Sequence, residues 1–225
     1  MAFELHRAIQ WCDMHSKQSE DRRTLRRQFL EIVARRQRPG AGSTLAALDQ
    51  RRMLMDWWDE ADRVLRDVPH AVGGAVAANA YAPERSTHDI DLMVLVADAE
   101  RAAALLHDAG WRRIGSLAGI TGSSWKDGDG HDLDLIELVE PWGVEAIGTA
   151  QANVIAGMPT LTLPYLTWMK LSAARTVDLA DISRMLGRAT PEQMRDARAV
   201  VARLGIPDDV ADFDQLVQMG RLERS

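Results

Sequence analysis

One segment constrains the fold more than any other, because two acidic residues flank an apolar one and then run into a wholly apolar stretch. Asp89 and Asp91 lie on either side of Ile90, and residues 92–96 read Leu-Met-Val-Leu-Val. In a β-strand, residues two apart point to the same face, so both carboxylates share a face while Ile90 points to the core. The segment therefore predicts a largely buried strand that begins with two converging carboxylates.

A second segment repeats this alternation. Residues 132–136 read Asp-Leu-Asp-Leu-Ile and follow the turn-forming sequence Asp-Gly-Asp-Gly at 127–130. Asp132 and Asp134 share a face, and the sequence leaves open which of them joins the first pair; we prefer Asp134, which Leu133 and Leu135 flank. Carboxylates brought so close repel one another unless a cation lies between them, and Mg²⁺ favours such oxygens. A solvated strand start without any metal is the alternative.

A glycine pair precedes the first acidic segment. Gly73 and Gly74 end a short predicted strand, directly before a segment rich in helix formers. Backbone N–H groups at such a junction face outward at the positive end of a helix, which suits a triphosphate. Glycine pairs alone are mostly tight turns, but together with two acidic strands they indicate a phosphate and metal site.

The rest of the chain indicates an α+β fold, with a small mixed sheet between N-terminal and C-terminal helical regions. We divide it into a helical extension (1–66), a core (67–140) and a helical C-terminal region (141–225). The expected helices lie at about 3–38, 44–65, 75–82, 98–109, 165–176, 178–186, 191–204 and 208–219, and the expected strands at 70–74, 88–96, 111–114, 123–126 and 131–138.

Composition favours a soluble cytoplasmic protein that does not enter the membrane. The chain has a single cysteine, its start lacks the apolar core of a signal peptide, and no run of about eighteen apolar residues occurs. The net charge is −6, yet residues 1–52 carry +5 and the remainder −11. A basic arm of this kind could attract nucleic acid or an acidic partner, although solvated faces of amphipathic helices would give the same pattern.

Residues 72–92, from Val72-Gly-Gly to Asp-Ile-Asp-Leu92, closely resemble the nucleotidyltransferase signature of the DNA polymerase β superfamily. That signature is a Gly-Gly or Gly-Ser turn, then Asp-x-Asp, then a separate acidic strand. The form Arg-x-Thr-x-Asp-Ile-Asp at 85–91 looks most like minimal bacterial abortive-infection enzymes and the nucleotidyltransferase members of toxin–antitoxin pairs. Residues 163–182 are similar to the helical motif of the same group. The match covers roughly residues 70–187, and the first 65 residues have no counterpart.

The resemblance implies a nucleotidyltransferase core at 67–140, with residues 141–225 completing the nucleotide site. Asp134 would also help to deprotonate the acceptor. Lys170 could instead be a surface lysine, and Arg175 could simply form i,i+3 ion pairs between helices. The implied roles are one or two Mg²⁺ on Asp89, Asp91 and Asp134, and nucleotide contacts from Gly73, Gly74, Arg85, Thr87, Lys170 and Arg175; for Arg85 and Thr87 a loop ion pair is equally compatible.

The implied reaction moves a nucleoside monophosphate from a nucleoside triphosphate, such as ATP, to a hydroxyl acceptor. RNA and a partner protein, such as a cognate toxin or antitoxin, are the acceptors that we expect. An antibiotic acceptor is an alternative, and a non-catalytic nucleotide-binding or interaction module is the alternative outside enzymes. The sequence gives neither the nucleotide nor the oligomeric state.

Overall fold

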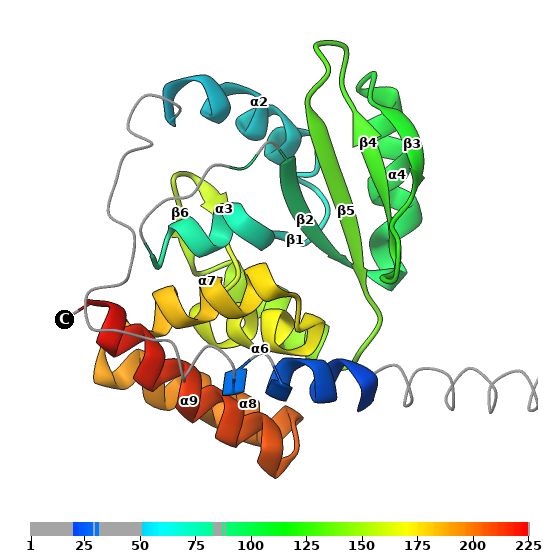
Figure 1. The fold of residues 1–225 in the computed structure, drawn as a ribbon. Coiled ribbons are helices and arrows are strands. Elements are labelled where there is room, and N and C mark those ends of the chain that lie inside the picture. The colour runs from blue at the N-terminus through cyan, green and yellow to red at the C-terminus, as the bar shows by residue number, and fades with distance from the viewer. Residues whose placement is uncertain (1–19, 29, 32–50, 83–86, 88, 225) are drawn as a thin grey trace, which may run out of the picture. The chain divides into compact units, whose positions relative to one another are not determined.

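The computed structural model of the chain describes residues 20–28, 30–31, 51–82, 87 and 89–224 (Figure 1). The chain forms two compact units, one of residues 43–166 and the other of residues 1–42 together with 167–225. We name them the sheet unit and the helical unit. The division of the chain at residues 66 and 140 stays a prediction. None of the helices in the described part has both the length and the apolar run needed to cross a bilayer.

The sheet unit is built on one five-stranded mixed sheet with the order β1-β2-β5-β4-β3. Strands β2 and β5 are parallel, and every other neighbouring pair is antiparallel. The α+β class is therefore confirmed. The strands are β1 (His70–Val72), β2 (Asp89–Leu95), β3 (Arg112–Ser116), β4 (Gly122–Lys126) and β5 (Asp132–Leu138).

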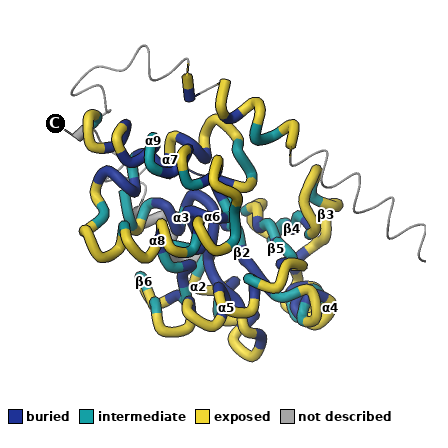
Figure 2. The backbone as a smooth tube through the Cα atoms, turned by 90° about the horizontal axis from the view of Figure 1, so that it is seen from below, coloured by how far each residue is buried: buried dark blue, intermediate teal, exposed yellow. Residues whose placement is uncertain are grey.

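Burial along the sheet follows the sequence pattern. In β2, Ile90 and residues 92–94 have no exposed surface, whereas every residue of the edge strand β3 is exposed (Figure 2). Helices α3 and α5 pack against β2, and α4 contacts both β2 and β3. The elements beside the sheet are α2 (Arg51–Val64), α3 (Gly74–Asn79), the 3-10 turn η1 (Val96–Asp98), α4 (Ala99–Asp108), α5 (Trp142–Ala150) and the hairpin β6 (Val154–Ile155) with β7 (Met158–Pro159).

Helix α5 and the β6–β7 hairpin had not been expected from the sequence. Two glycines, Gly143 and Gly148, lie in α5 and lower its intrinsic helix propensity. The helix forms because it packs on β1 and β2 and buries Ala146, Ile147 and Ala150. Gly143 lies so close to Leu138 that a side chain there would crowd the strand. Tertiary packing therefore overrides local preference in this segment.

The helical unit consists mainly of C-terminal helices. Residues 20–28 and 30–31 are helical, and α7 and α8 both pack on α9. Helices α7 and α9 approach closely, since any side chain at Gly220 would overlap the carbonyl oxygen of Ser183. The remaining helices are α6 (Leu163–Ala173), which begins in the sheet unit, α7 (Thr176–Leu186), α8 (Pro191–Leu204) and α9 (Pro207–Arg224).

Arginines of the basic N-terminal segment pair with acids at the start of α9. Arg26 is fully buried and donates from Nη2 to Asp209 over 2.5 Å and from Nε to Asp212 over 2.7 Å. Arg23 also pairs with Asp209, and Arg27 pairs with Asp208. The charge pattern suggested that the basic segment could attract an acidic partner. For these three arginines, the acidic partners are residues of the same chain.

Candidate active site

Parallel pairing of β2 with β5 brings the two acidic segments together. Asp91 lies beside Asp134 in the register, and Asp89 lies beside Asp132. Carboxylate oxygens of Asp89, Asp91 and Asp134 all lie within 4.8 Å of one another. We call these three residues the carboxylate cluster. Two segments more than forty residues apart in the sequence thus supply one group of negative charges.

Cross-strand pairing separates Asp132 from Asp134. Lys126 faces Asp132 across β4 and β5, and its Nζ lies 2.9 Å from the Asp132 carboxylate. Both side chains are partly exposed. In the described part of the chain, the residue of β5 that joins Asp89 and Asp91 is therefore Asp134, while Asp132 belongs to an ion pair at the surface.

Hydroxyl groups hold two of the three carboxylates. Thr87 Oγ1 donates to Asp89 Oδ1 over 2.5 Å, and Ser124 Oγ donates to Asp134 Oδ1 over 2.6 Å. Ser124 lies directly opposite Asp134 in the β4–β5 register. Distances of about 2.5–2.7 Å are typical of hydroxyls that donate to ionised carboxylates.

The environment of Asp134 opposes its negative charge. Burial raises the pKa of its carboxyl group, the hydrogen bond from Ser124 lowers it, and the charges of Asp89 and Asp132 raise it further, so that the pKa lies above its ordinary value. A cation within the cluster would relieve this repulsion. Because Mg²⁺ prefers carboxylate oxygens, the donor set fits a hard divalent ion.

The glycine turn lies against the cluster. Gly73 donates its N–H to the backbone carbonyl of Asp91 over 2.8 Å and so extends the pairing of β1 with β2. Gly74 follows with φ +55°, in the left-handed region. A side chain at Gly74 would overlap Oδ2 of Asp91. Glycine is therefore required at this position both by its backbone conformation and by the carboxylate beside it.

Lys170 and Arg175 lie in the helical unit. Lys170 is 2% exposed, so the alternative of a surface lysine is wrong. Its Nζ donates to Asp178 over 3.2 Å and to Asp181 over 2.8 Å. Arg175 donates from Nε to Asp178 over 2.6 Å, which is the i,i+3 pair that the sequence allowed. Contact of Lys170 or Arg175 with a nucleotide stays a prediction, as do the nucleotide roles of Gly73, Gly74 and Thr87, and Arg85 lies outside the described residues.

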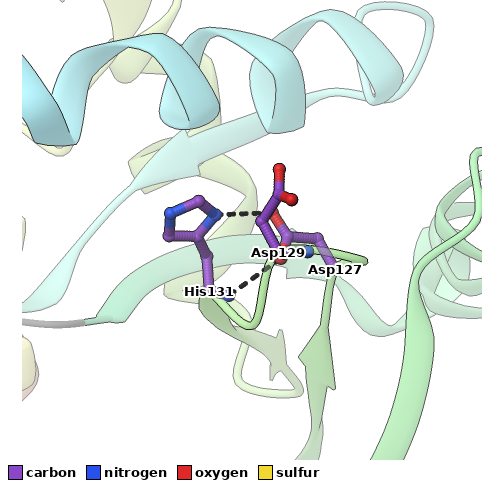
Figure 3. A group of neighbouring side chains, drawn as sticks. All are labelled: Asp127, Asp129 and His131. Carbon is purple, nitrogen blue, oxygen red and sulfur yellow. Dashed lines mark hydrogen bonds and ion pairs between the residues drawn. The ribbon is translucent and has the colours of Figure 1, made fainter.

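A second group of potential metal ligands lies in the turn between β4 and β5, at Asp127, Asp129 and His131 (Figure 3). Asp127 Oδ1 accepts the backbone N–H groups of Asp129 and His131, and Asp127 Oδ2 lies 2.6 Å from Nδ1 of His131. Burial raises the pKa of the Asp127 carboxyl, but these hydrogen bonds outweigh it and hold the pKa below its ordinary value. The group forms a hydrogen-bonded turn, which accounts for its geometry.

Ser124 was not predicted to lie beside Asp134. A turn confined to residues 127–130 would pair Lys126 with His131 and Ser124 with Leu133. In the structure His131 belongs to the turn, so Lys126 pairs with Asp132 and Ser124 pairs with Asp134. Trp125 Nε1 donates to the neighbouring Ser123 over 2.9 Å, so that second serine supports the core.

No protein-family model matches the sequence, and no curated protein matches it. Several solved structures are similar to the chain, three of them as follows. The antibiotic-resistance factor ANT(2'')-Ia, in a solution structure, is 21% identical, with 76% of this chain and 92% of that chain covered and a TM-score of 0.44. JHP933 from Helicobacter pylori is 15% identical, with 80% and 94% covered and a TM-score of 0.44.

The lincosamide antibiotic adenylyltransferase LnuA, bound to lincomycin, is 14% identical, with 41% of this chain and 59% of that chain covered and a TM-score of 0.32. All three identities lie below 25% and all three TM-scores below 0.5. We draw no functional conclusion from these similarities, and the carboxylate cluster carries the proposal below.

Proposed function

We propose that this chain is a magnesium-dependent nucleotidyltransferase, which moves a nucleoside monophosphate from a nucleoside triphosphate to a hydroxyl acceptor. The observation that carries the proposal is the carboxylate cluster of Asp89, Asp91 and Asp134, with the Gly73-Gly74 turn directly against it. The resemblance of residues 72–92 to the nucleotidyltransferase signature supports it.

In this proposal Asp89, Asp91 and Asp134 hold one or two Mg²⁺. When bound, the ion neutralises phosphate charge and lowers the pKa of the attacking hydroxyl. The first amides of α3, which follow Gly73, have no acceptor within their own helix. In this proposal they donate to phosphate oxygens, and Gly74, which has no side chain, leaves room for the Asp91 carboxylate beside them.

The chemical step is an in-line displacement. The acceptor oxygen attacks the α-phosphorus, the bond from that phosphorus to the bridging oxygen breaks, and pyrophosphate leaves. Asp134 accepts the proton of the acceptor hydroxyl. Both the bond that forms and the bond that breaks belong to the substrates. The protein contributes by orienting the substrates and by stabilising charge.

For the acceptor we propose a hydroxyl of a partner protein, such as a cognate toxin or antitoxin, ahead of RNA. The RNA hypothesis drew on the basic charge of residues 1–52. Arg23, Arg26 and Arg27 from that segment are paired with acids of α9, which leaves less positive charge for a phosphate backbone. Incubation with each α-labelled triphosphate, total RNA and cell protein distinguishes the two acceptors by where the label appears.

The first test of the reaction is substitution within the cluster. We expect Asp89→Ala and Asp91→Ala to lower Mg²⁺-dependent nucleotide transfer by about 10³-fold, because the loss of a metal ligand removes several kcal/mol of charge stabilisation. The measurement is label transfer from the α-labelled triphosphate that the wild type uses, with circular dichroism to confirm the fold.

Asp132→Ala is the matched control, since Asp132 lies on the same face of β5 as Asp134 and outside the cluster. We expect it to keep most of the activity. Wild-type rates in both cluster variants would overturn the proposal, and so would an equal loss in the Asp132 variant.

A further inference from the structure

The carboxylate cluster contains three groups that repel one another, yet each is constrained by a different neighbour. Asp91 lies against Gly74, which offers no side chain. Asp89 accepts from Thr87, and Asp134 accepts from Ser124. The terminal torsion of an aspartate is soft, so a carboxylate without such a donor can rotate.

The geometry points to Thr87 and Ser124 as positioning residues, whose hydroxyls fix Asp89 and Asp134 in the orientation that binds the divalent ion. This inference rests on the proposed function, because it assigns the support of the same metal site. It goes beyond that function, which assigns to neither hydroxyl the support of a metal ligand.

Both hydroxyls are suited to this role. A serine or threonine hydroxyl has one proton, so each can donate to one carboxylate oxygen and leaves the second oxygen of that carboxylate for a cation. Thr87 is almost fully buried, and Ser124 is held in the middle of the sheet by the pairing of β4 with both β3 and β5.

The like charges make this support necessary. Oxygens of Asp89, Asp91 and Asp134 lie within 4.8 Å of one another, so the ionised carboxylates repel. Without Ser124, Asp134 would lose the hydrogen bond that holds its Oδ1 against this repulsion. Groups that orient a metal ligand typically change metal affinity by about 10–100-fold when they are removed.

The test is a titration of the full chain with Mn²⁺ alone, with free Mn²⁺ measured by electron paramagnetic resonance and Mg²⁺ used as competitor. We expect Ser124→Ala and Thr87→Val each to weaken Mn²⁺ binding by roughly tenfold. Ser124→Thr and Thr87→Ser, which keep the hydroxyl, should restore it. Ser116→Ala on the exposed strand β3 is the control for a serine lost from the same sheet.

A second readout separates positioning from chemistry. Raising the Mg²⁺ concentration should restore the rate of nucleotide transfer in Ser124→Ala, because its ligands remain, but not in Asp134→Ala. The inference is overturned if Ser124→Ala and Thr87→Val bind Mn²⁺ as the wild type does, or if the variants that keep the hydroxyl bind it as weakly. Hydroxyl-dependent Mn²⁺ binding without transfer to any acceptor would instead support the inference and overturn the proposed function.

Discussion

Both units hold groups of carboxylates, buried in the helical unit and half-buried in the sheet unit, and these groups have different partners. In the helical unit, Asp178 and Asp181 surround the ammonium group of Lys170, and Asp209 and Asp212 share the guanidinium group of Arg26. In the carboxylate cluster of the sheet unit, acids face acids. Within the described residues, no lysine or arginine forms an ion pair with Asp89 or Asp134, whose hydrogen bonds come from hydroxyls.

This difference separates charge that maintains the fold from charge that is available for chemistry. An acid paired with a buried base is satisfied by the chain, and removal of the base leaves an uncompensated charge in the interior. Asp89 and Asp134 lie close together and repel each other, and an ion from solution can relieve that repulsion. Each of the following predictions tests one side of this contrast.

The largest effect is expected in the helical unit. Lys170→Met leaves Asp178 and Asp181 buried without the ammonium group, and we expect the free energy of unfolding to fall by about 3–5 kcal/mol. Urea unfolding followed by circular dichroism measures it. Adding Asp178→Asn and Asp181→Asn to the same variant should recover most of the loss, because both buried carboxylate charges are then removed. A triple variant as unstable as the single one would show that packing of the lysine chain, not its charge, stabilises the helices.

A smaller effect of opposite sign is expected in the carboxylate cluster. Asp134→Asn removes a repelling charge and keeps an oxygen for Ser124, so in EDTA the free energy of unfolding should rise by roughly 1 kcal/mol or less. Because the folded-state pKa of Asp134 is raised, the repulsion is present above that pKa and is relieved as pH falls through it. The difference between wild type and variant should therefore shrink in acid, and Mg²⁺ should stabilise the wild type alone. If the wild type is more stable than Asp134→Asn in EDTA at neutral pH, the carboxylates of the cluster do not destabilise the fold, and the contrast between the two units is wrong.

The smallest effect is expected for the exposed pair beside the cluster. Lys126→Ala removes an ion pair in which Asp132 is 52% exposed, so thermal unfolding should reveal a change of under about 0.5 kcal/mol. A loss as large as that of the lysine in α6 would mean that burial does not decide the strength of these pairs.

The sequence predicted most of the sheet and the positions of its acids. Strands β2 and β5 were expected because alternation and an apolar run are properties of neighbouring residues, and the α+β class followed from them. The glycine turn and the helix α8, with its capping residue Thr190, were equally local signals. The expected helix at 3–38 lies largely outside the described residues.

What the sequence could not give depends on contacts between distant segments. The choice between Asp132 and Asp134 needed the β2–β5 register and the partner of Lys126. The burial of Lys170 needed the position of α7, since a lysine on an apolar helix is compatible with either surface or core. Helix α5 was missed for the same reason, because its support comes from the sheet.

Parallel pairing of β2 with β5 also decides when the cluster can exist during synthesis. The chain must pass through α4, β3 and β4 before β5 can join β2, and non-local strand pairing of this kind is slow to form. A nascent chain in which residue 134 has not yet been synthesised has only Asp89 and Asp91, two of the three members of the cluster. The complete cluster consequently forms only after β5 has joined β2.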